Sequence, residues 1–358
     1  MSTPVDLAAL EVGDLETLVA DWGEARFHAR QIHRWIHARG VADPAQMTDL
    51  PGRLRDRMRE AATVATPEVV ADDLSEDGTR KLVLGLADGR RIEAVYIPDT
   101  PKQTFCISTQ VGCAMGCGFC LTGKMGLVRH LTAGEICGQV RVLAGATGLL
   151  GKPFNLVLMG MGEPLHNYDA TMQAFRMLTG SHGMALPARR ITLSTVGIVP
   201  AMDRLAAEPA IPNLAVSLHA TTDQQRTALV PPNQKYPLAE ILDACRRFPL
   251  SRRDRITFEY VLLDGVNDSV ADARRLAALV EGLQAKVNVI PLNPAPGIPY
   301  GRPPDAAIDR FARTLSERGV RVSVRKSRGR DIRAACGQLI VDDGPGRSTG
   351  QQIAELLS

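Results

Sequence analysis

The chain has 358 residues, of which 45% are hydrophobic and 23% are charged, and its formal net charge is +3. This length leaves room for one large α/β domain and a small accessory domain. No apolar run approaches the roughly 18 residues that span a bilayer, and the weak net charge leaves any nucleic-acid contact to local basic patches. The acidic N-terminus lacks the basic start and long apolar stretch of an exported protein, so we expect a cytoplasmic protein that does not contact membranes.

The first part of the chain predicts a small helical domain. Apolar side chains recur at helical spacing between residues 14 and 62, and Pro44 and Pro51 divide this segment. Its outer faces are rich in arginine, which is typical of a solvated helix face and equally of an RNA-docking surface. We assign residues 1–75 to a helical accessory domain.

Residues 79–98 alternate apolar and polar side chains around Asp88 and Gly89, a pattern typical of a β-hairpin. This hairpin is expected to link two domains. The remaining assignments are a hairpin linker over residues 76–100, a barrel domain over residues 101–345 and a C-terminal tail over residues 346–358.

Beyond the hairpin, short apolar strands alternate with amphipathic helices, which predicts parallel strands joined by crossover helices. The strands are expected near residues 104–110, 155–160, 190–194, 213–218, 256–263, 286–292 and 320–325. Polar or Gly-rich sequence follows each of them, and parallel α/β folds form their sites at the carboxyl ends of strands. We therefore expect an α/β fold with a partial barrel of the (β/α)6 type. A doubly wound open sheet is the alternative, although the first βα turn carries cysteines instead of a GxGxxG fingerprint.

Three of the seven cysteines lie in one Gly-rich loop after the first barrel strand: Cys113, Cys117 and Cys120. Three converging thiolates can bind a [4Fe–4S] cluster and leave one iron open for a small molecule. Zinc usually takes two separated pairs of ligands, and the sequence has no second pair of that kind. Cys137 and Cys245 fall within helical patterns, so we expect them to pack as small buried side chains.

A CxxxCxxC loop after the first barrel strand resembles the radical S-adenosylmethionine (SAM) superfamily. In that superfamily the open iron binds the amino and carboxylate groups of SAM, and an electron from the cluster releases a 5′-deoxyadenosyl radical. Four stretches narrow the resemblance to RNA adenine methyltransferases of the RlmN/Cfr type: TFCISTQVGCAMGCGFC, NLVLMGMGEPLHNYDAT, NLAVSLHA and RGRDIRAACGQL. The resemblance extends over about residues 25–340 and includes QIHRWIHARGV in the accessory domain.

The resemblance implies methylation of carbon 2 of an adenine in 23S rRNA and tRNA, with two SAM molecules used per turnover. One SAM methylates Cys336, and the radical from the second takes a hydrogen from that methyl group. The methylene radical then adds to the electron-poor carbon and joins protein to RNA. Cys106 matches the cysteine that resolves this adduct by forming a disulfide with Cys336. Glu93 matches the general base that removes the proton from the substituted carbon.

The resemblance also implies a set of SAM contacts at the strand ends. Glu163 would pair with the SAM amino group, and Gly162 would let the backbone approach it. The other implied contacts are Ser194, Ser217, Leu218, His219 and Asn293. His130 stands where the family usually has asparagine, a departure that concerns a local loop or RNA contact and not the cluster.

The implied partners are an RNA loop or bulge, whose bases unstack at low cost, and an electron donor such as flavodoxin or ferredoxin. We expect a monomer. Basic clusters that could neutralise phosphates are Arg189–Arg190, Arg246–Arg247, Arg252–Arg255 and Arg325–Arg333, of which the last flanks Cys336. Two alternatives remain open. One is an enzyme of the Cfr type that methylates carbon 8 of adenine, and the other is a non-catalytic iron–sulfur or zinc protein that binds RNA without cleaving SAM.

Overall fold

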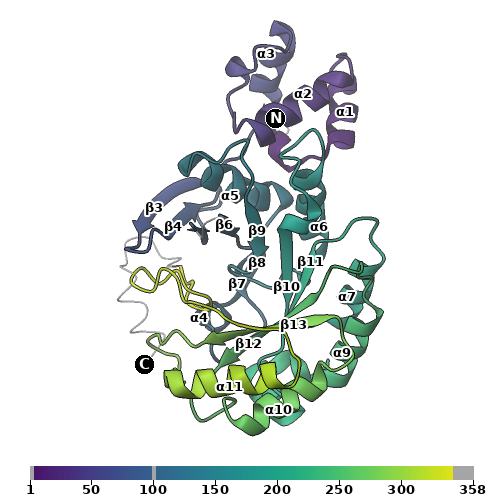
Figure 1. Ribbon diagram of the computed structural model, residues 1–358. Helices are drawn as coiled ribbons and strands as arrows, with labels where there is room; N and C mark the ends of the chain where they lie inside the picture. Colours follow the sequence, from purple (N-terminus) through teal and green to yellow (C-terminus); the bar gives the residue numbers. More distant parts are fainter. Residues whose placement is uncertain (1–3, 99–101, 342–358) are drawn as a thin grey trace.

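A curved mixed sheet organises the molecule. The computed structural model describes residues 4–98 and 102–341. Within these residues the large sheet has ten strands in the order β14-β13-β12-β11-β10-β9-β6-β5-β4-β3. The strands from β14 to β6 are parallel to their neighbours, and they curve into an open barrel with helices on its outer side (Figure 1). The predicted α/β fold with a partial barrel is therefore confirmed.

The parallel strands arise from the apolar runs in the sequence. They are β6 (Thr104–Cys106), β9 (Asn155–Leu158), β10 (Ile191–Thr195), β11 (Asn213–Ser217), β12 (Ile256–Leu262), β13 (Ala285–Pro291) and β14 (Val322–Val324). All seven residues of β12 are buried, as expected of a parallel strand covered on both faces. The helices of the barrel are α5 (Ala133–Ala146), α6 (Tyr168–Thr179), α7 (Val199–Ala206), α8 (Asp223–Leu229), α9 (Leu238–Arg247), α10 (Val270–Leu279) and α11 (Asp305–Glu317).

The first predicted barrel strand is shorter than the expected range 104–110. Strand β6 ends at Cys106, and the chain then forms β7 (Gln110–Cys113), which pairs with β8 (Gly126–His130) in a separate antiparallel sheet. The short helix α4 (Leu121–Lys124) lies between them. Gly112 has a φ of +73°, and a Cβ at this position would overlap the carbonyl oxygen of Gly126. Glycine is therefore required for the close approach of β7 and β8 that frames the cysteine loop.

The predicted hairpin is present as β4 (Arg80–Gly85) and β5 (Arg91–Ile97). Because β5 also pairs with β6, the hairpin extends the barrel sheet. A further strand, β3 (Glu68–Leu74), was not predicted, and it lies entirely inside the range 1–75 that was assigned to the helical domain. Most of its side chains are exposed and several are acidic, so this edge strand lacks the apolar alternation on which strand prediction depends.

The N-terminal segment forms the expected helical unit with its own core. Its elements are β1 (Val5–Asp6), η1 (Leu7–Ala9), α1 (Val12–Asp21), α2 (Phe27–His33), the π-helical turn η2 (Arg34–Ala38), η3 (Pro44–Gln46), α3 (Gly52–Ala61) and β2 (Ala62–Thr63). The two prolines mark the starts of η3 and α3, as the sequence predicts. Figure 1 shows this unit at the end of the barrel near α5 and α6. The predicted tail over residues 346–358 lies outside the described residues.

No helix in the described residues is both long enough and apolar enough to cross a membrane.

Candidate active site

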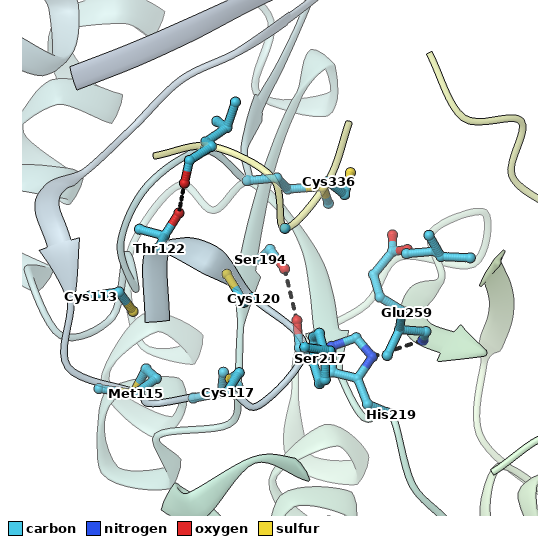
Figure 2. A pocket seen from close by; sticks show the side chains of 18 of the residues that line it. Cys113, Met115, Cys117, Cys120, Thr122, Ser194, Ser217, His219, Glu259 and Cys336 are labelled. Atoms are coloured by element: carbon cyan, nitrogen blue, oxygen red, sulfur yellow. Dashed lines mark hydrogen bonds between the residues drawn. The ribbon is translucent and has the colours of Figure 1, made fainter. Parts of the chain in front are cut away.

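The three clustered cysteines line one cavity at the carboxyl ends of the parallel strands (Figure 2), which we call the first cavity. Cys113 ends β7, and Cys117 and Cys120 follow in the loop that leads to α4. Burial, and then the neighbouring thiols of Cys120 and Cys113, raise the pKa of Cys117 well above its usual value. Thiols in this setting stay protonated until a metal replaces their protons.

The arrangement of these thiols fits an iron–sulfur cluster better than a single metal ion. In the part of the chain that the structure describes, no three His, Cys, Asp or Glu side chains lie close enough to hold one ion in common. A mononuclear zinc site would need such a grouping. A cuboidal cluster binds each thiolate through a different iron, so three thiols spread around one cavity can hold it.

Gly162 and Glu163 form one wall of the first cavity, beyond the end of β9. Gly162 has a φ of +101°, and a Cβ there would lie 2.6 Å from the Cβ of Gln110, so the turn needs glycine. The Glu163 carboxylate accepts hydrogen bonds from the backbone N–H groups of Val196 (2.8 Å) and Leu165 (3.0 Å). Burial raises the pKa of Glu163 to about 7, although these donors act to lower it. A carboxylate oriented in this way can pair with an ammonium group of a ligand.

Ser194, Ser217 and His219 line the wall formed by β10 and β11. The two serine Oγ atoms lie 3.4 Å apart. His219 Nδ1 accepts a hydrogen bond from the backbone N–H of Val261 at 3.0 Å, so the ring proton is on Nε2. Burial, followed by the charge of Arg226, lowers the pKa of His219 to about 3, which leaves a neutral imidazole.

Leu218 does not line the first cavity, although Ser217 and His219 on either side of it do. It is fully buried. Its side chain belongs to the main hydrophobic core, and its backbone N–H donates to the Glu259 carbonyl at 3.0 Å.

Two buried acceptor atoms in the first cavity have no hydrogen-bond partner: Oδ1 of Asn293 and Oε2 of Glu259. Buried polar atoms are rarely left unpaired, so a donor group of a ligand is expected near each of them. Asn293 was predicted as a SAM contact, whereas Glu259 was missed. The signal for it is a single carboxylate within the apolar strand sequence ITFEYVL.

The C-terminal segment carries Cys336 across the mouth of the first cavity (Figure 2). The backbone N–H of Leu121 donates to the carbonyl of Gly337 at 2.8 Å, and Thr122 Oγ1 donates to the carbonyl of Leu339 at 2.6 Å. These bonds join the segment to helix α4, directly after the cysteine loop. Cys336 therefore lies beside the predicted cluster site although it is more than 200 residues away in sequence.

A turn between β3 and β4 anchors the chain on the other side of Cys336. Ser75 Oγ donates to Asp331 Oδ1 at 2.5 Å, and the backbone N–H of Gly329 donates to Asp77 Oδ2 at 3.0 Å. These contacts hold the basic segment before Cys336 against the sheet edge, and no local sequence pattern predicts them.

Cys106 is buried at the end of β6. Burial first, and then the thiol of Cys336, raise the pKa of Cys106 to about 12. Both cysteines are free, and no disulfide joins any pair of cysteines in the described residues. The predicted disulfide is thus not a feature of this structure.

Glu93 lies on β5 with its side chain almost fully buried, and it is not in the lining of the first cavity. Its Oε1 pairs with Lys81 Nζ at 3.1 Å, and its Oε2 accepts from the backbone N–H of Ile340 at 2.8 Å. Burial raises the pKa of Glu93 to about 7, with the charge of Asp73 in the same direction and Lys81 acting against it. Glu93 thus lies beneath the same C-terminal segment that carries Cys336.

His130 joins a small polar network next to the first cavity. Its Nδ1 lies 2.9 Å from Gln110 Nε2, and its ring meets His166 edge-on at 5.1 Å. Gln110 Oε1 accepts from the backbone N–H of Glu163 at 2.8 Å. His130 therefore supports the turn that carries Glu163. Cys137 and Cys245 are buried in α5 and α9, as predicted.

Comparisons with known proteins agree with this geometry. Residues 5–64 match the family model of the ribosomal RNA large subunit methyltransferase N-terminal domain, and residues 107–277 match that of the radical SAM superfamily. The chain is 49% identical over 357 residues to the dual-specificity RNA methyltransferase RlmN of Anaeromyxobacter dehalogenans, covering 98% of this chain and 96% of that protein. It is 47% identical over 339 residues to the protein of the same name from Geobacter sulfurreducens, covering 95% and 93%. A crystal structure of a radical SAM methyltransferase from Sphaerobacter thermophilus superposes with a TM-score of 0.90 at 48% identity, covering 94% and 99%.

Proposed function

Because the chain belongs to the RlmN family of dual-specificity radical SAM RNA methyltransferases, we propose that it methylates carbon 2 of an adenine in 23S rRNA and in tRNA. One observation carries this proposal: Cys336 lines the same cavity as Cys113, Cys117 and Cys120. A protein that only binds RNA through a metal centre has no use for a fourth, separate cysteine at that place.

The three clustered thiols would hold a [4Fe–4S] cluster, and the opposite walls would hold SAM. Glu163 would pair with the SAM ammonium, and the unpartnered Oδ1 of Asn293 would accept a hydrogen bond from the same ligand. His219, which is neutral, can donate through Nε2 without placing a second positive charge beside the sulfonium. When bound, these cofactors would supply the electron and the methyl and radical chemistry of the reaction, with two SAM molecules per turnover.

Cys336 would carry the transferred carbon. The methyl carbon on its sulfur, once it has lost a hydrogen atom, would form a bond to carbon 2 of adenine and so join protein and RNA. The unpaired electron of this adduct would pass back to the bound cofactors. Glu93 would accept the proton from that carbon. Cys106 would then attack the Cys336 sulfur, so that a disulfide forms, the sulfur–carbon bond breaks and the departing carbon takes a proton to become the methyl group. A thiol reductant would restore both cysteines before the next turnover.

The pH dependence of this reaction should reflect the ionisation of the Glu93 carboxyl group. A general base must be ionised, so the rate of adduct resolution should rise as the pH increases through about 7, the raised pKa of this carboxyl. In Glu93→Gln this rise should disappear and the rate should fall by roughly 10²- to 10⁴-fold. Single-turnover reactions from pH 5.5 to 8.5, quenched and analysed for methylated adenosine, provide the measurement. Equal pH profiles for the two proteins would remove Glu93 from the mechanism.

RNA should contact the basic segment at residues 325–333. Four arginines of the helical domain, Arg30, Arg53, Arg57 and Arg59, form ion pairs within that domain. Arg246 and Arg247 are paired as well, with Asp243 and Asp203. Ion pairing lowers the positive charge that these residues offer to phosphates. Arg328 in the segment at residues 325–333 is also paired, with Asp77, so it is the position of this segment beside Cys336 that favours it as the RNA contact. We also expect the protein to be a cytoplasmic monomer that receives its electrons from a flavodoxin or a ferredoxin.

Two measurements test the proposed function together. Protein reconstituted with iron and sulfide under anoxic conditions should cleave SAM to 5′-deoxyadenosine when a reductant is supplied. RNA from cells that lack the protein should acquire 2-methyladenosine in 23S rRNA and tRNA when the enzyme is added, as measured by nucleoside mass spectrometry. Formation of 8-methyladenosine instead would favour the carbon-8 alternative, and the absence of SAM cleavage would favour a binding protein.

A further inference from the structure

Cys336 stands at the boundary between two cavities. The second cavity, with a volume of about 510 Å³, shares Ile290, Asn293, Arg325 and Cys336 with the first. It is also lined by Ile97 at the end of β5, Thr104 at the start of β6 and residues of β14, so it occupies the open side of the barrel. Its volume lies within the range of about 300–1,000 Å³ that is typical of small-molecule sites. A sulfur at such a boundary can accept a carbon from a ligand in one cavity and transfer it to a ligand in the other.

The lining of the second cavity suits a nucleotide. Arg325, Lys326 and Arg328 contribute positive charge, and no acidic side chain lines the cavity among the described residues. Ile97, Ile290 and Val324 provide apolar surface against which a base can pack. Cations for phosphates beside apolar walls for a base are the usual features of a site for an unstacked nucleotide.

One polar side chain in this cavity is held in a defined orientation. Asn288 Nδ2 donates to Glu259 Oε1 at 3.0 Å, and Asn288 Oδ1 accepts from Ser323 Oγ at 2.5 Å. Because a carboxylate oxygen can only accept from the amide, these two bonds distinguish the Asn288 nitrogen from its oxygen. The amide retains one N–H and one lone pair for a ligand. Asn288 lines the second cavity but not the first, whereas Glu259 lines the first but not the second.

We propose that the second cavity binds the target adenosine and that Asn288 pairs with its N6 amino group and N7, an inference that rests on the proposed function. The acceptor and donor capacity that remains on the amide matches the N6–H donor and N7 acceptor of adenine, the usual pairing of asparagine with this base. This pairing has a chemical consequence. It covers the edge next to carbon 8 and leaves carbon 2, on the opposite side of the purine, free to meet Cys336. Asn288 is thus a specificity residue for the base and for the carbon that is methylated.

A chemical double-mutant cycle tests this assignment. RNA substrates are made with either adenosine or 7-deazaadenosine at the mapped methylation position, so that N7 is replaced by C–H. For the wild-type enzyme, the 7-deaza substitution should lower kcat/KM roughly tenfold or more, because the Asn288 N–H loses its acceptor. Asn288→Ala should methylate normal RNA with a similarly lowered kcat/KM, and it should lose the additional 7-deaza penalty. Electronic effects of the substitution on carbon 2 act equally in both enzymes and cancel in the cycle.

One further readout and one control variant separate this inference from the proposed function. Methylation of Cys336 by SAM alone, measured by peptide mass spectrometry without RNA, uses the first cavity and should be unchanged in Asn288→Ala. Asn213→Ala is the matched control, because Asn213 lies on β11, hydrogen-bonds the backbone carbonyl of Arg189 at 2.8 Å and lines neither cavity. This control should keep the wild-type 7-deaza penalty.

The possible results lead to different conclusions. An equal 7-deaza penalty in wild type and Asn288→Ala would overturn the assignment, as would a wild-type enzyme that is indifferent to N7. Loss of Cys336 methylation in Asn288→Ala would also overturn it, because the residue would then serve the SAM side or the fold. Wild-type enzyme that never methylates Cys336 would instead count against the proposed function.

Discussion

Replacement of Cys336 by alanine should abolish RNA methylation, with a fall in rate of at least roughly 10⁴-fold, as expected when the residue that bonds to the substrate is removed. The side chain lies at the mouth of the first cavity and beside the second, and no other described cysteine lines both. No other described cysteine is therefore placed to carry a carbon from one cavity to the other. Incorporation of labelled methyl groups from SAM into RNA measures this loss.

The loss should come from chemistry and not from the fold. Cys336 is free and exposed, so Cys336→Ala should keep its iron content and its thermal unfolding temperature. Cys336→Ser preserves size and polarity and should be equally inactive, because an oxygen cannot be released by disulfide formation. Cys245→Ala, the same substitution in the buried face of α9, serves as the control and should methylate RNA. Methylation by Cys336→Ala within tenfold of wild type would contradict the carrier role.

Much of the barrel could be predicted because its signals are local. Apolar runs such as those of β11 and β12 identify buried parallel strands wherever they occur in a chain, and the Asp88-Gly89 turn identifies the hairpin. Strand β3 could not be predicted, since it is an exposed edge strand whose formation depends on the adjacent β4. The break between β6 and β7 likewise depends on a glycine that lets two backbones approach, a contact that is visible only in three dimensions.

The site residues also fall into two groups, those that a local motif predicts and those that only the tertiary structure brings together. The three clustered cysteines form a motif within eight residues, so sequence alone predicts a shared ligand. Glu259 and Asn288 are single polar residues inside strands, and they meet only because the register of β12 and β13 places them opposite each other. Asp331 and Ser75 hydrogen-bond across 256 positions of sequence. Such pairs arise from tertiary structure, and no local pattern marks them.

Replacement of Cys106 by alanine should give a different result from replacement of Cys336. Radical addition to the base does not need Cys106, so Cys106→Ala should form the bond between Cys336 and RNA and then stop. After one turnover, denaturing gels should show protein that migrates with RNA and loses the added mass on nuclease treatment. Peptide mass spectrometry should find a nucleotide on Cys336. The double variant Cys106→Ala/Cys336→Ala should form no crosslink, which makes it the matched control.

The loss of the neighbouring Cys106 thiol explains why the trapped species should be long-lived. The pKa of its thiol is raised to about 12, so in the free enzyme Cys106 is protonated and reacts slowly with external oxidants, which protects it from premature oxidation to a disulfide with Cys336. Resolution of the adduct by Cys106 is an intramolecular reaction of a thiol held near the Cys336 sulfur, and a small external thiol does not reach the same effective concentration there. Added dithiothreitol should release RNA from the Cys106→Ala crosslink at least roughly 10²-fold more slowly than wild type completes turnover. Normal turnover by Cys106→Ala, with no crosslink at any time point, would show that another group resolves the adduct.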